Sequence, residues 1–352
     1  MGRPTELERM LALAVGGQSV RLAAPRRYGK TTLLAELAEV AWSAHGLVPA
    51  VVDLSRVTSV DDVVIRITRA YAAGLERGRL RAAWRAIRAR LSAQAQIGLP
   101  GARVGAAIGQ PAPADRLAAL HEVLDLPVKV HERTGERCLV VFDEFQDLLT
   151  VDQHLDGVLR SHLQHHGAAA SYLFAGSQPS LMATLFGDRE RPLFEQARAM
   201  TLGPLPLADL TDYVIAKVEE AGRDDLADDA AEIVALSEGH PQRAMLLAHM
   251  LFEQPTEAED PVGGALSAAL REASDALEQA WRGLSTAQRR VLGGVAAGHT
   301  SVLSNAALEY ASQGKSTQAK ARDALITATH LRMQGDRAEF VDPLMAHWLR
   351  AR

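Results

Sequence analysis

The segment Ala24–Thr31, which reads APRRYGKT, constrains the fold more than any other part of the chain. It follows a short apolar run at 20–23 and precedes a helical pattern from Thr32 to Ala41. A strand, a tight loop and a helix in this order form a phosphate-binding P-loop, whose N–H groups surround phosphate oxygens at the positive end of the helix. Ala24 replaces the first glycine of the motif, whereas Gly29, which allows close backbone approach, is present. The alternative is an ordinary basic turn before a helix.

The P-loop interpretation gives each side chain a role. Lys30 can reach the β- and γ-phosphates of a nucleotide, and the Thr31 hydroxyl can ligate Mg²⁺. The residues expected to contact the nucleotide here are Pro25, Arg26, Arg27, Tyr28, Gly29, Lys30, Thr31 and Thr32.

A second motif, Cys138–Glu144, reads CLVVFDE and favours nucleotide binding over the basic turn. A continuous apolar run that ends in two acids is typical of a strand buried on both faces with carboxylates at its tip, which is a Walker B arrangement. Asp143 is then expected to hold Mg²⁺, directly or through water. Glu144 is expected to orient and polarise the attacking water. The alternative is a buried strand followed by a solvated turn.

Strands and helices alternate through the first two hundred residues, which predicts a parallel sheet with helices on both faces. Ligands of such sheets bind at the carboxyl ends of the strands, where both motifs fall. The Gly- and Pro-containing segment 97–113 interrupts the pattern and is interpreted as a loop or short hairpin. The predicted strands are Ser19–Ala23, Leu47–Leu54, Arg137–Asp143, Ala169–Gly176 and Ala199–Leu202.

The second half of the chain changes character. Amphipathic patterns at 207–221, 225–238 and 241–252 predict a small helical lid, and the acidic, Pro- and Gly-rich segment 253–264 suggests a linker. Helical patterns at 286–297, 305–312 and 317–329, then a hairpin turn at Gln334-Gly335-Asp336, predict a winged helix-turn-helix. A last amphipathic helix follows Asp342-Pro343. The predicted domains are an α/β P-loop domain at 1–203, a lid at 204–262, a linker helix at 263–283 and a winged helix at 284–352.

Composition limits the class of protein further. The 352 residues include a single cysteine, Cys138, which lies inside an apolar strand and is expected in the core, so a reducing cytoplasm fits. No spacing is typical of a zinc site, and the adjacent His165 and His166 are expected at the surface. No run approaches 18 apolar residues and the N-terminus lacks an apolar leader, so neither a membrane span nor secretion is expected.

Charge is distributed unevenly along the chain. Residues 284–352 contain nine Lys and Arg and five Asp and Glu, a balance of +4 in a chain of net charge −5. A basic module on an acidic body suits DNA docking. The predicted recognition helix at 317–329, however, offers only Gln318, Lys320 and Arg322 for contacts with bases, and Lys315 lies just before it. Docking of a protein partner is the other interpretation. The arginines between Arg77 and Arg90 form either a phosphate- or acid-binding face or, more commonly, a solvated one, and Trp84 among them is expected to pack.

Five segments together resemble the archaeal-type ATPases of the AAA+/STAND class, which also occur in bacteria. They are Pro4-Thr5-Glu6-Leu7, the P-loop 25–31, Ala175-Gly176-Ser177, the lid motif Gly239–Arg243 and the closing segment Asp342–Trp348. The resemblance covers most of the chain. It implies ATP and Mg²⁺ as cofactors, a P-loop domain with a lid and a winged helix, and sensing of the γ-phosphate near Ser177.

Further candidates depend partly on that resemblance. Ser177 is expected to bond the γ-phosphate, against the alternative of a hydroxyl satisfied in a turn. Pro241 can line the adenine and Arg243 can reach the phosphates, against a helix start with an exposed arginine. Arg189, Arg191 and Arg198 are candidates for an arginine finger that acts across a subunit interface, and Arg198 is the one expected to take part in catalysis. The alternative for each is a solvated surface residue.

The function expected from the sequence is a Mg²⁺-dependent ATPase switch whose nucleotide state controls engagement of a protein partner or of DNA, with a nucleotide-dependent homo-oligomer as one form. The presence of Glu144 favours this function. The alternative is a non-catalytic, nucleotide-gated scaffold or a winged-helix DNA-binding regulator.

Overall fold

The computed structural model describes residues 2–76, 80–94 and 113–352. These residues form two compact units. The first, called the α/β unit, contains Arg3–Ala24 and Lys30–Thr201, and the second, called the helical unit, contains Pro25–Gly29 and Leu202–Arg352. The predicted boundary of the P-loop domain at residue 203 lies close to this division.

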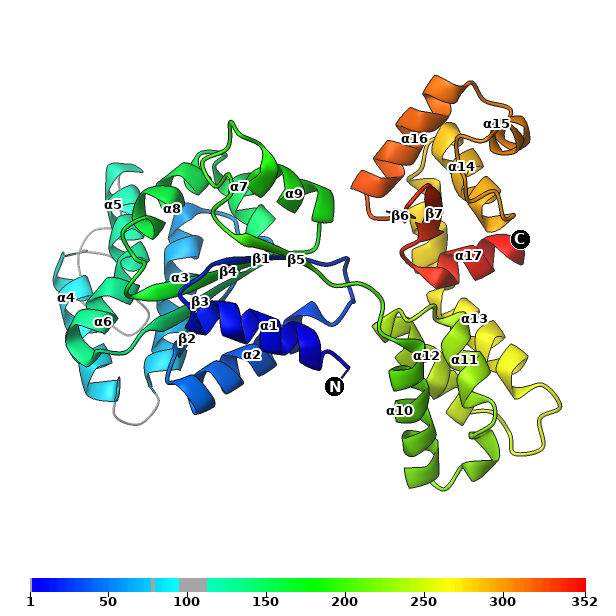
Figure 1. Cartoon of the computed structure of the whole chain (residues 1–352), viewed down its shortest axis with the longest axis horizontal. Coiled ribbons are helices and arrows are strands. Elements are labelled where there is room, and N and C mark those ends of the chain that lie inside the picture. The colour runs from blue at the N-terminus through cyan, green and yellow to red at the C-terminus, as the bar shows by residue number, and fades with distance from the viewer. Residues whose placement is uncertain (1, 77–79, 95–112) are drawn as a thin grey trace, which may run out of the picture. The chain divides into compact units, whose positions relative to one another are not determined.

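The α/β unit is built on five parallel strands: β1 (Val20–Ala23), β2 (Val48–Asp53), β3 (Cys138–Asp143), β4 (Ala170–Gly176) and β5 (Arg198–Thr201). Their order is β2-β3-β4-β1-β5 (Figure 1). In this order β1, which leads into the P-loop, lies beside β4, and β4 separates β1 from β3. All five predicted strands are confirmed, with no boundary shifted by more than one residue.

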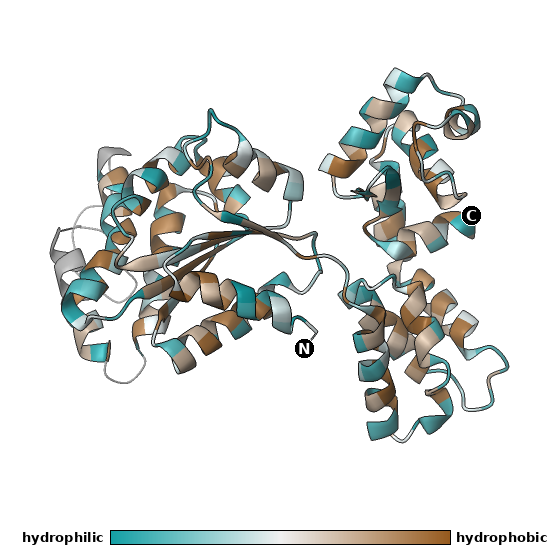
Figure 2. Cartoon of the chain, viewed as in Figure 1, coloured by the Kyte–Doolittle hydropathy of each residue, from teal (hydrophilic) through white to brown (hydrophobic). Residues whose placement is uncertain are grey.

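Both faces of the central strands β3 and β4 are buried, as their unbroken apolar runs predict, whereas the edge strands β2 and β5 have exposed positions. Every residue of β3 and β4 is buried, and Figure 2 shows the strands as a mainly hydrophobic layer. Cys138, Val140 and Phe142 pack into a cluster with Tyr172 and Phe174 of β4, whereas the intervening residues of β3 point to the opposite face. Burial raises the pKa of the Cys138 thiol to about 12, which confirms a core cysteine.

Helices cover the two faces of this sheet, with α1 and α2 on one side and α7 to α9 on the other (Figure 1). Their bounds are α1 (Pro4–Val15), α2 (Lys30–His45), α3 (Val60–Leu75), α4 (Arg81–Gln94), α5 (Pro113–Leu124), α6 (Leu126–Thr134), α7 (Leu148–Val151), α8 (Leu155–Leu163) and α9 (Pro179–Gly187). The predicted loop at 97–113 lies outside the described residues except at its end, where α5 begins. Arg77 and Arg79 also lie outside them, and Trp84 packs in the core with 4% of its surface exposed.

One surface prediction in this unit is wrong. His165 is exposed, but His166 is only 2% exposed. The turn between α8 and β4 folds His166 inward, where its Nδ1 lies 2.6 Å from the Tyr172 hydroxyl. The sequence alone does not show this, because both histidines belong to a short polar connection.

The helical unit begins with α10 (Leu207–Glu220), α11 (Ala230–Leu236) and α12 (Pro241–Phe252). The predicted segment 225–238 is only partly α-helical, since residues 224–226 form a 3₁₀ turn. The expected linker ends sooner than predicted, because α13 (Pro261–Arg282) starts inside it. Asp260 caps α13 by accepting a hydrogen bond from the Gly263 N–H at 2.8 Å, and Pro261 occupies the first turn.

The remaining helices are α14 (Thr286–Ala296), α15 (Asn305–Ala311), α16 (Lys315–Thr327) and α17 (Pro343–Arg350). Strands β6 (Leu331–Gln334) and β7 (Arg337–Phe340) pair antiparallel around Gly335, whose φ of 63° suits a tight hairpin turn. Three helices followed by this hairpin have the order of elements predicted for a winged helix. One hydrophobic cluster runs from Leu210 to Ala346, so the lid helices, α13 and the winged helix share a core.

Candidate nucleotide-binding and hydrolysis site

The carboxyl ends of three neighbouring strands bring the main predicted residues together in the α/β unit. Lys30 begins α2 after β1, Asp143 ends β3, and Ser177 directly follows β4. Ala23 of β1 is in register with Gly176 of β4, and the Ala24 N–H donates to the Gly176 carbonyl at 3.1 Å. The parallel topology therefore converts three distant sequence segments into one cluster.

Lys30 is the electrostatic centre of this cluster. Its ammonium group pairs with a carboxylate oxygen of Asp143 and, at 2.8 Å, with Oε1 of Glu144. The Lys30 side chain is 6% exposed, and those of Asp143 and Glu144 are 10% and 21% exposed. A lysine that is nearly buried requires such compensation. The positive charge expected to meet phosphates is thus paired with the two acids of the Walker B motif.

Glu144 is held in an unusual backbone conformation. Its φ of 52° and ψ of 43° are left-handed, which is strained for a residue with a side chain. Its Oε2 accepts hydrogen bonds from Gln146 Nε2 at 2.6 Å and from the Ser177 N–H at 3.2 Å. Backbone strain together with two side-chain partners, Lys30 and Gln146, and one backbone N–H, that of Ser177, fixes this carboxylate in one position.

Gln146 is a residue of this site that the sequence prediction missed. It is 3% exposed and its amide holds Glu144 directly. Gln146 lies in a 3₁₀ turn, Phe145–Asp147, that follows the Walker B acids. Its position two residues after Glu144 is the signal that was available in the sequence.

The environment keeps Glu144 ionised. Burial by itself raises the pKa of this carboxyl, but hydrogen bonds from Lys30, Ser177 and Gln146 outweigh it and lower the pKa below the ordinary value for Glu. An ionised carboxylate near neutral pH is the state that a water-polarising group needs.

The Ser177 hydroxyl is buried and has no hydrogen-bond partner among the described residues. The Gln146 Oε1 atom is also buried without a hydrogen-bond partner among the described residues. Buried polar atoms are nearly always bonded in folded proteins, and exceptions point to a ligand or water. An unsatisfied hydroxyl one residue beyond β4 and next to the Glu144 carboxylate fits contact with a bound group.

The proposed Mg²⁺ ligands also lie together. Thr31 Oγ1 donates to Asp143 Oδ2 at 3.3 Å, and Thr31 is exposed at the start of α2. Hydroxyl and carboxylate oxygens are the hard ligands that Mg²⁺ prefers. The donor set of Thr31 and Asp143 therefore fits this cation.

The other residues predicted for the P-loop differ in backbone conformation and in exposure. Gly29 has a φ of 79°, a value that favours glycine, and Arg27 shares this left-handed region at 68°. Pro25 is partly exposed, Arg26 is exposed, and Thr32 is exposed on α2. Tyr28 is 2% exposed within the helical unit, where its ring lies edge-on to His240 with centroids 4.8 Å apart. A buried tyrosine at this loop position was not anticipated from the sequence.

The predicted lid residues lie at the start of α12. Pro241 occupies its first turn, as expected. Arg243 is 4% exposed, and its guanidinium forms two hydrogen bonds to Asp342, with Nε–Oδ1 at 2.9 Å and Nη2–Oδ2 at 2.5 Å. The alternative of an exposed arginine is therefore wrong. A contact between Arg243 and phosphates stays a prediction, and it requires Asp342 to release the guanidinium.

The finger candidates do not join the cluster. Arg189 is exposed, and Arg191 lies 3.6 Å from the buried carboxylate of Asp156. Arg198 is exposed at the first residue of β5, in register with Val20, and donates to Gln18 Oε1 at 3.2 Å. Arg198 therefore lies at the amino end of the sheet, opposite the Walker residues of its own chain. A role across a subunit interface stays a prediction for all three.

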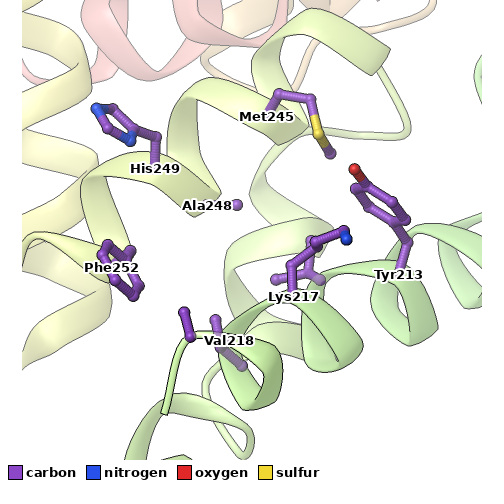
Figure 3. A pocket seen from close by; sticks show the side chains of 9 residues that line it. Tyr213, Lys217, Val218, Met245, Ala248, His249 and Phe252 are labelled. Carbon is purple, nitrogen blue, oxygen red and sulfur yellow. The ribbon is translucent and has the colours of Figure 1, made fainter. Parts of the chain in front are cut away.

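An apolar pocket lies elsewhere, between α10 and α12 of the helical unit (Figure 3). Its volume is about 270 Å³, and its rim includes Met245 and Phe252, which are 37% and 39% exposed. None of its lining residues belongs to the predicted nucleotide site. Among the described helices, none combines the length and apolarity needed to cross a bilayer.

No protein-family model and no curated protein sequence matches the chain. Solved structures do resemble it. A Walker-type ATPase of Pyrococcus abyssi matches with a TM-score of 0.69 and 15% identity, over 99% of this chain and 96% of that one. The ORC2 protein of Aeropyrum pernix matches in its ADPNP–ADP complexes with a TM-score of 0.59 and 15% identity, over 99% and 91%. Its ADP form matches with 0.51 and 16%, over 98% and 90%. The chain thus has the fold of these P-loop proteins along nearly its whole length.

Proposed function

We propose that this chain is a Mg²⁺-dependent ATPase of the AAA+/STAND type, a switch that couples its nucleotide state to engagement of a partner. The observation that carries the proposal is the cluster of Lys30, Asp143, Glu144 and Ser177 at adjacent strand ends. The similar ORC2 structure contains ADPNP and ADP, which supports adenine nucleotides as the ligand.

The chain's own residues suggest how hydrolysis proceeds. Lys30 exchanges its carboxylate partners for the β- and γ-phosphates when the nucleotide binds. This exchange releases Oε1 of Glu144, whose Oε2 remains fixed by Gln146 and Ser177, so the carboxylate can orient a water and accept its proton. The Ser177 hydroxyl gains the partner that it lacks.

Thr31 and Asp143 would hold the metal ion. When bound, Mg²⁺ supplies positive charge to the phosphate oxygens. Asp143 ends β3, and Lys30 and Thr31 begin α2, the helix that follows β1 and the P-loop. A reducing compartment such as the cytoplasm is part of the proposal, since the sole cysteine is a buried thiol.

The second candidate function is a non-catalytic, nucleotide-gated scaffold or DNA-binding regulator. It keeps the phosphate contacts of Lys30 but gives no role to Glu144, so the position of the Glu144 carboxylate, held by Gln146 and the Ser177 N–H beside Lys30, favours the ATPase. Phosphate release measured with and without DNA separates the two functions. Measuring the mass of the protein with and without ATP tests the nucleotide-dependent homo-oligomer.

Replacement of Ser177 by alanine gives a specific test of γ-phosphate sensing. We expect turnover to fall about tenfold or more, because a hydrogen bond to a charged group is removed. Stability without nucleotide should not fall, since the hydroxyl has no partner to lose. The measurements are steady-state phosphate release and the unfolding midpoint of the nucleotide-free protein.

Ser171→Ala is the matched control, because Ser171 lies on β4, the strand that Ser177 follows. Ser171 is also buried, but its hydroxyl donates to the Ala14 carbonyl at 2.6 Å and accepts from Arg137 at 3.0 Å. We expect this variant to lose stability and to keep its turnover. A Ser177→Ala variant with wild-type turnover would remove Ser177 from the site.

Docking of DNA by the winged helix has limited support. Lys315 and Lys320 are exposed, but Arg322 is paired with Asp323 at 2.7 Å. Gln318 is 1% exposed and donates to the Val302 carbonyl at 2.6 Å, so it is a core residue and not a reader of bases. A protein partner therefore remains the first choice, with DNA as the second.

If DNA does bind there, replacing Lys315, Lys320 and Arg322 by alanine should weaken binding and reduce its salt slope by about one for each phosphate that is no longer neutralised. The control is alanine at Lys217, Arg271 and Arg282, which are exposed outside the winged helix and remove the same charge. Binding is measured on the full chain as a function of salt. Equal effects of the two triple variants, or no salt-dependent binding at all, would leave only the protein partner.

A further inference from the structure

We propose that the α/β unit contains a second metal site, for Zn²⁺ or a chemically similar transition-metal ion, formed by Asp125, His162 and His166. One potential ligand atom from each residue lies within 4.8 Å of the others. Asp125 connects α5 to α6, His162 lies on α8, and His166 precedes β4. Three separate segments therefore converge at the amino end of β4, whereas the phosphate site lies at the carboxyl ends of the strands.

Two of the three distances suit a shared ion, and the third, between the two histidine nitrogens, lies within 4.8 Å and would shorten when the ion binds. Asp125 Oδ1 lies 3.4 Å from His166 Nε2 and 2.5 Å from His162 Nδ1. Two atoms bound to one tetrahedral Zn²⁺ at its usual bond lengths are about 3.3 Å apart. The first pair already has this spacing. The second pair, Asp125 Oδ1 and His162 Nδ1, forms a hydrogen bond that the ion would replace. These two atoms would have to move apart by less than about 1 Å to reach the spacing around the ion.

Each histidine has a partner on its other ring nitrogen. His166 Nδ1 lies 2.6 Å from the Tyr172 hydroxyl, and His162 Nε2 lies 2.7 Å from His121 Nδ1. Metal-binding histidines nearly always bond a second group in this way, which fixes the ring and directs the remaining nitrogen at the ion. Tyr172 and His121 are thus positioning residues for the two histidines.

Burial and chemistry select the class of ion. The His166 and His162 side chains are 2% and 11% exposed, so the histidines approach the ion from within the unit, while Asp125 is 45% exposed and leaves a route from solvent. Two imidazoles and one carboxylate suit Zn²⁺ and leave a fourth position open, whereas Mg²⁺ prefers oxygen ligands only. This site therefore differs in selectivity from Thr31 and Asp143.

The test is Zn²⁺ binding to the full chain after treatment with a chelator, with Mg²⁺ and ADP present to occupy the nucleotide site. We expect one tightly held Zn²⁺ per chain in competition with a chromophoric chelator. His162→Gln and Asp125→Asn should each weaken binding by at least about a hundredfold, because a ligand is removed. Tyr172→Phe removes only the hydroxyl behind His166 and should weaken binding by about 10- to 100-fold.

His165→Gln is the matched control, since this neighbouring histidine is exposed and outside the cluster. It should bind Zn²⁺ as the wild type does. Replacement with Co²⁺ should give the visible bands of nitrogen and oxygen coordination without a thiolate band, because the sole cysteine is buried and largely protonated.

Circular dichroism and Mg²⁺-ATP binding at the opposite end of the sheet verify that each variant is folded. If a ligand variant does not fold, Tyr172→Phe decides, because it preserves the ring in the core. The proposal is overturned if the wild type retains no Zn²⁺. It is also overturned if His162→Gln, Tyr172→Phe and His165→Gln all bind Zn²⁺ with wild-type affinity, which would show adventitious binding to surface histidines only.

Discussion

Glu144→Gln is expected to bind ATP with nearly wild-type affinity while phosphate release falls by about 10²- to 10⁴-fold, the usual contribution of a general base. The substitution keeps the shape of the side chain and its strained left-handed backbone, but the amide cannot accept a proton from water. The amide also cannot accept hydrogen bonds from Lys30, Gln146 and Ser177 at all of the positions where the carboxylate does. Turnover and nucleotide affinity are therefore measured separately, by phosphate release and by equilibrium binding of ATP.

Glu36→Gln is the matched control, since Glu36 is exposed on α2, the helix that Lys30 begins. We expect it to change neither quantity. Asp143→Asn should behave differently from Glu144→Gln, by weakening binding and the dependence on Mg²⁺ together. Wild-type turnover in Glu144→Gln would show that Glu144 is not the catalytic base and would favour the nucleotide-gated scaffold.

The sheet was predictable because its strands are short apolar runs with sharp ends. In β3 and β4 every position is buried, so both faces of these strands are apolar and the strands can be recognised without deciding which residues face the core. The start of α13 was less predictable, because the acidic, Pro- and Gly-rich composition of residues 253–264 suggests a linker throughout. The cap at Asp260 and the proline after it were the local signals that outweigh this composition.

Topology alone determines which of the predicted site residues lie together. Asp143, Glu144 and Ser177 stand at strand ends and Lys30 begins the helix after β1, and parallel strands bring such positions together. The contacts that sequence could not supply depend on tertiary packing. Arg243 finds Asp342, which is 99 residues away along the chain, and His166 finds Tyr172 and Asp125 from within a polar turn. Nothing local to Arg243 or His166 distinguishes them from surface residues.

Lys30→Ala is expected to abolish ATP binding. The variant loses the one ammonium group placed to meet the β- and γ-phosphates, and it also leaves the carboxylates of Asp143 and Glu144 uncompensated beside the nucleotide's own negative charge. Removing one member of a buried ion pair costs about 3–5 kcal/mol, so the unfolding midpoint of the nucleotide-free protein should also fall. The α/β unit offers a control in Lys129→Ala, because Lys129 is paired with Glu122 but is 31% exposed, and surface pairs contribute about 1 kcal/mol or less. Equilibrium binding of ATP and thermal unfolding are measured for both variants. A folded Lys30→Ala protein with unchanged ATP affinity would contradict the P-loop assignment itself, and with it every step of the proposed hydrolysis.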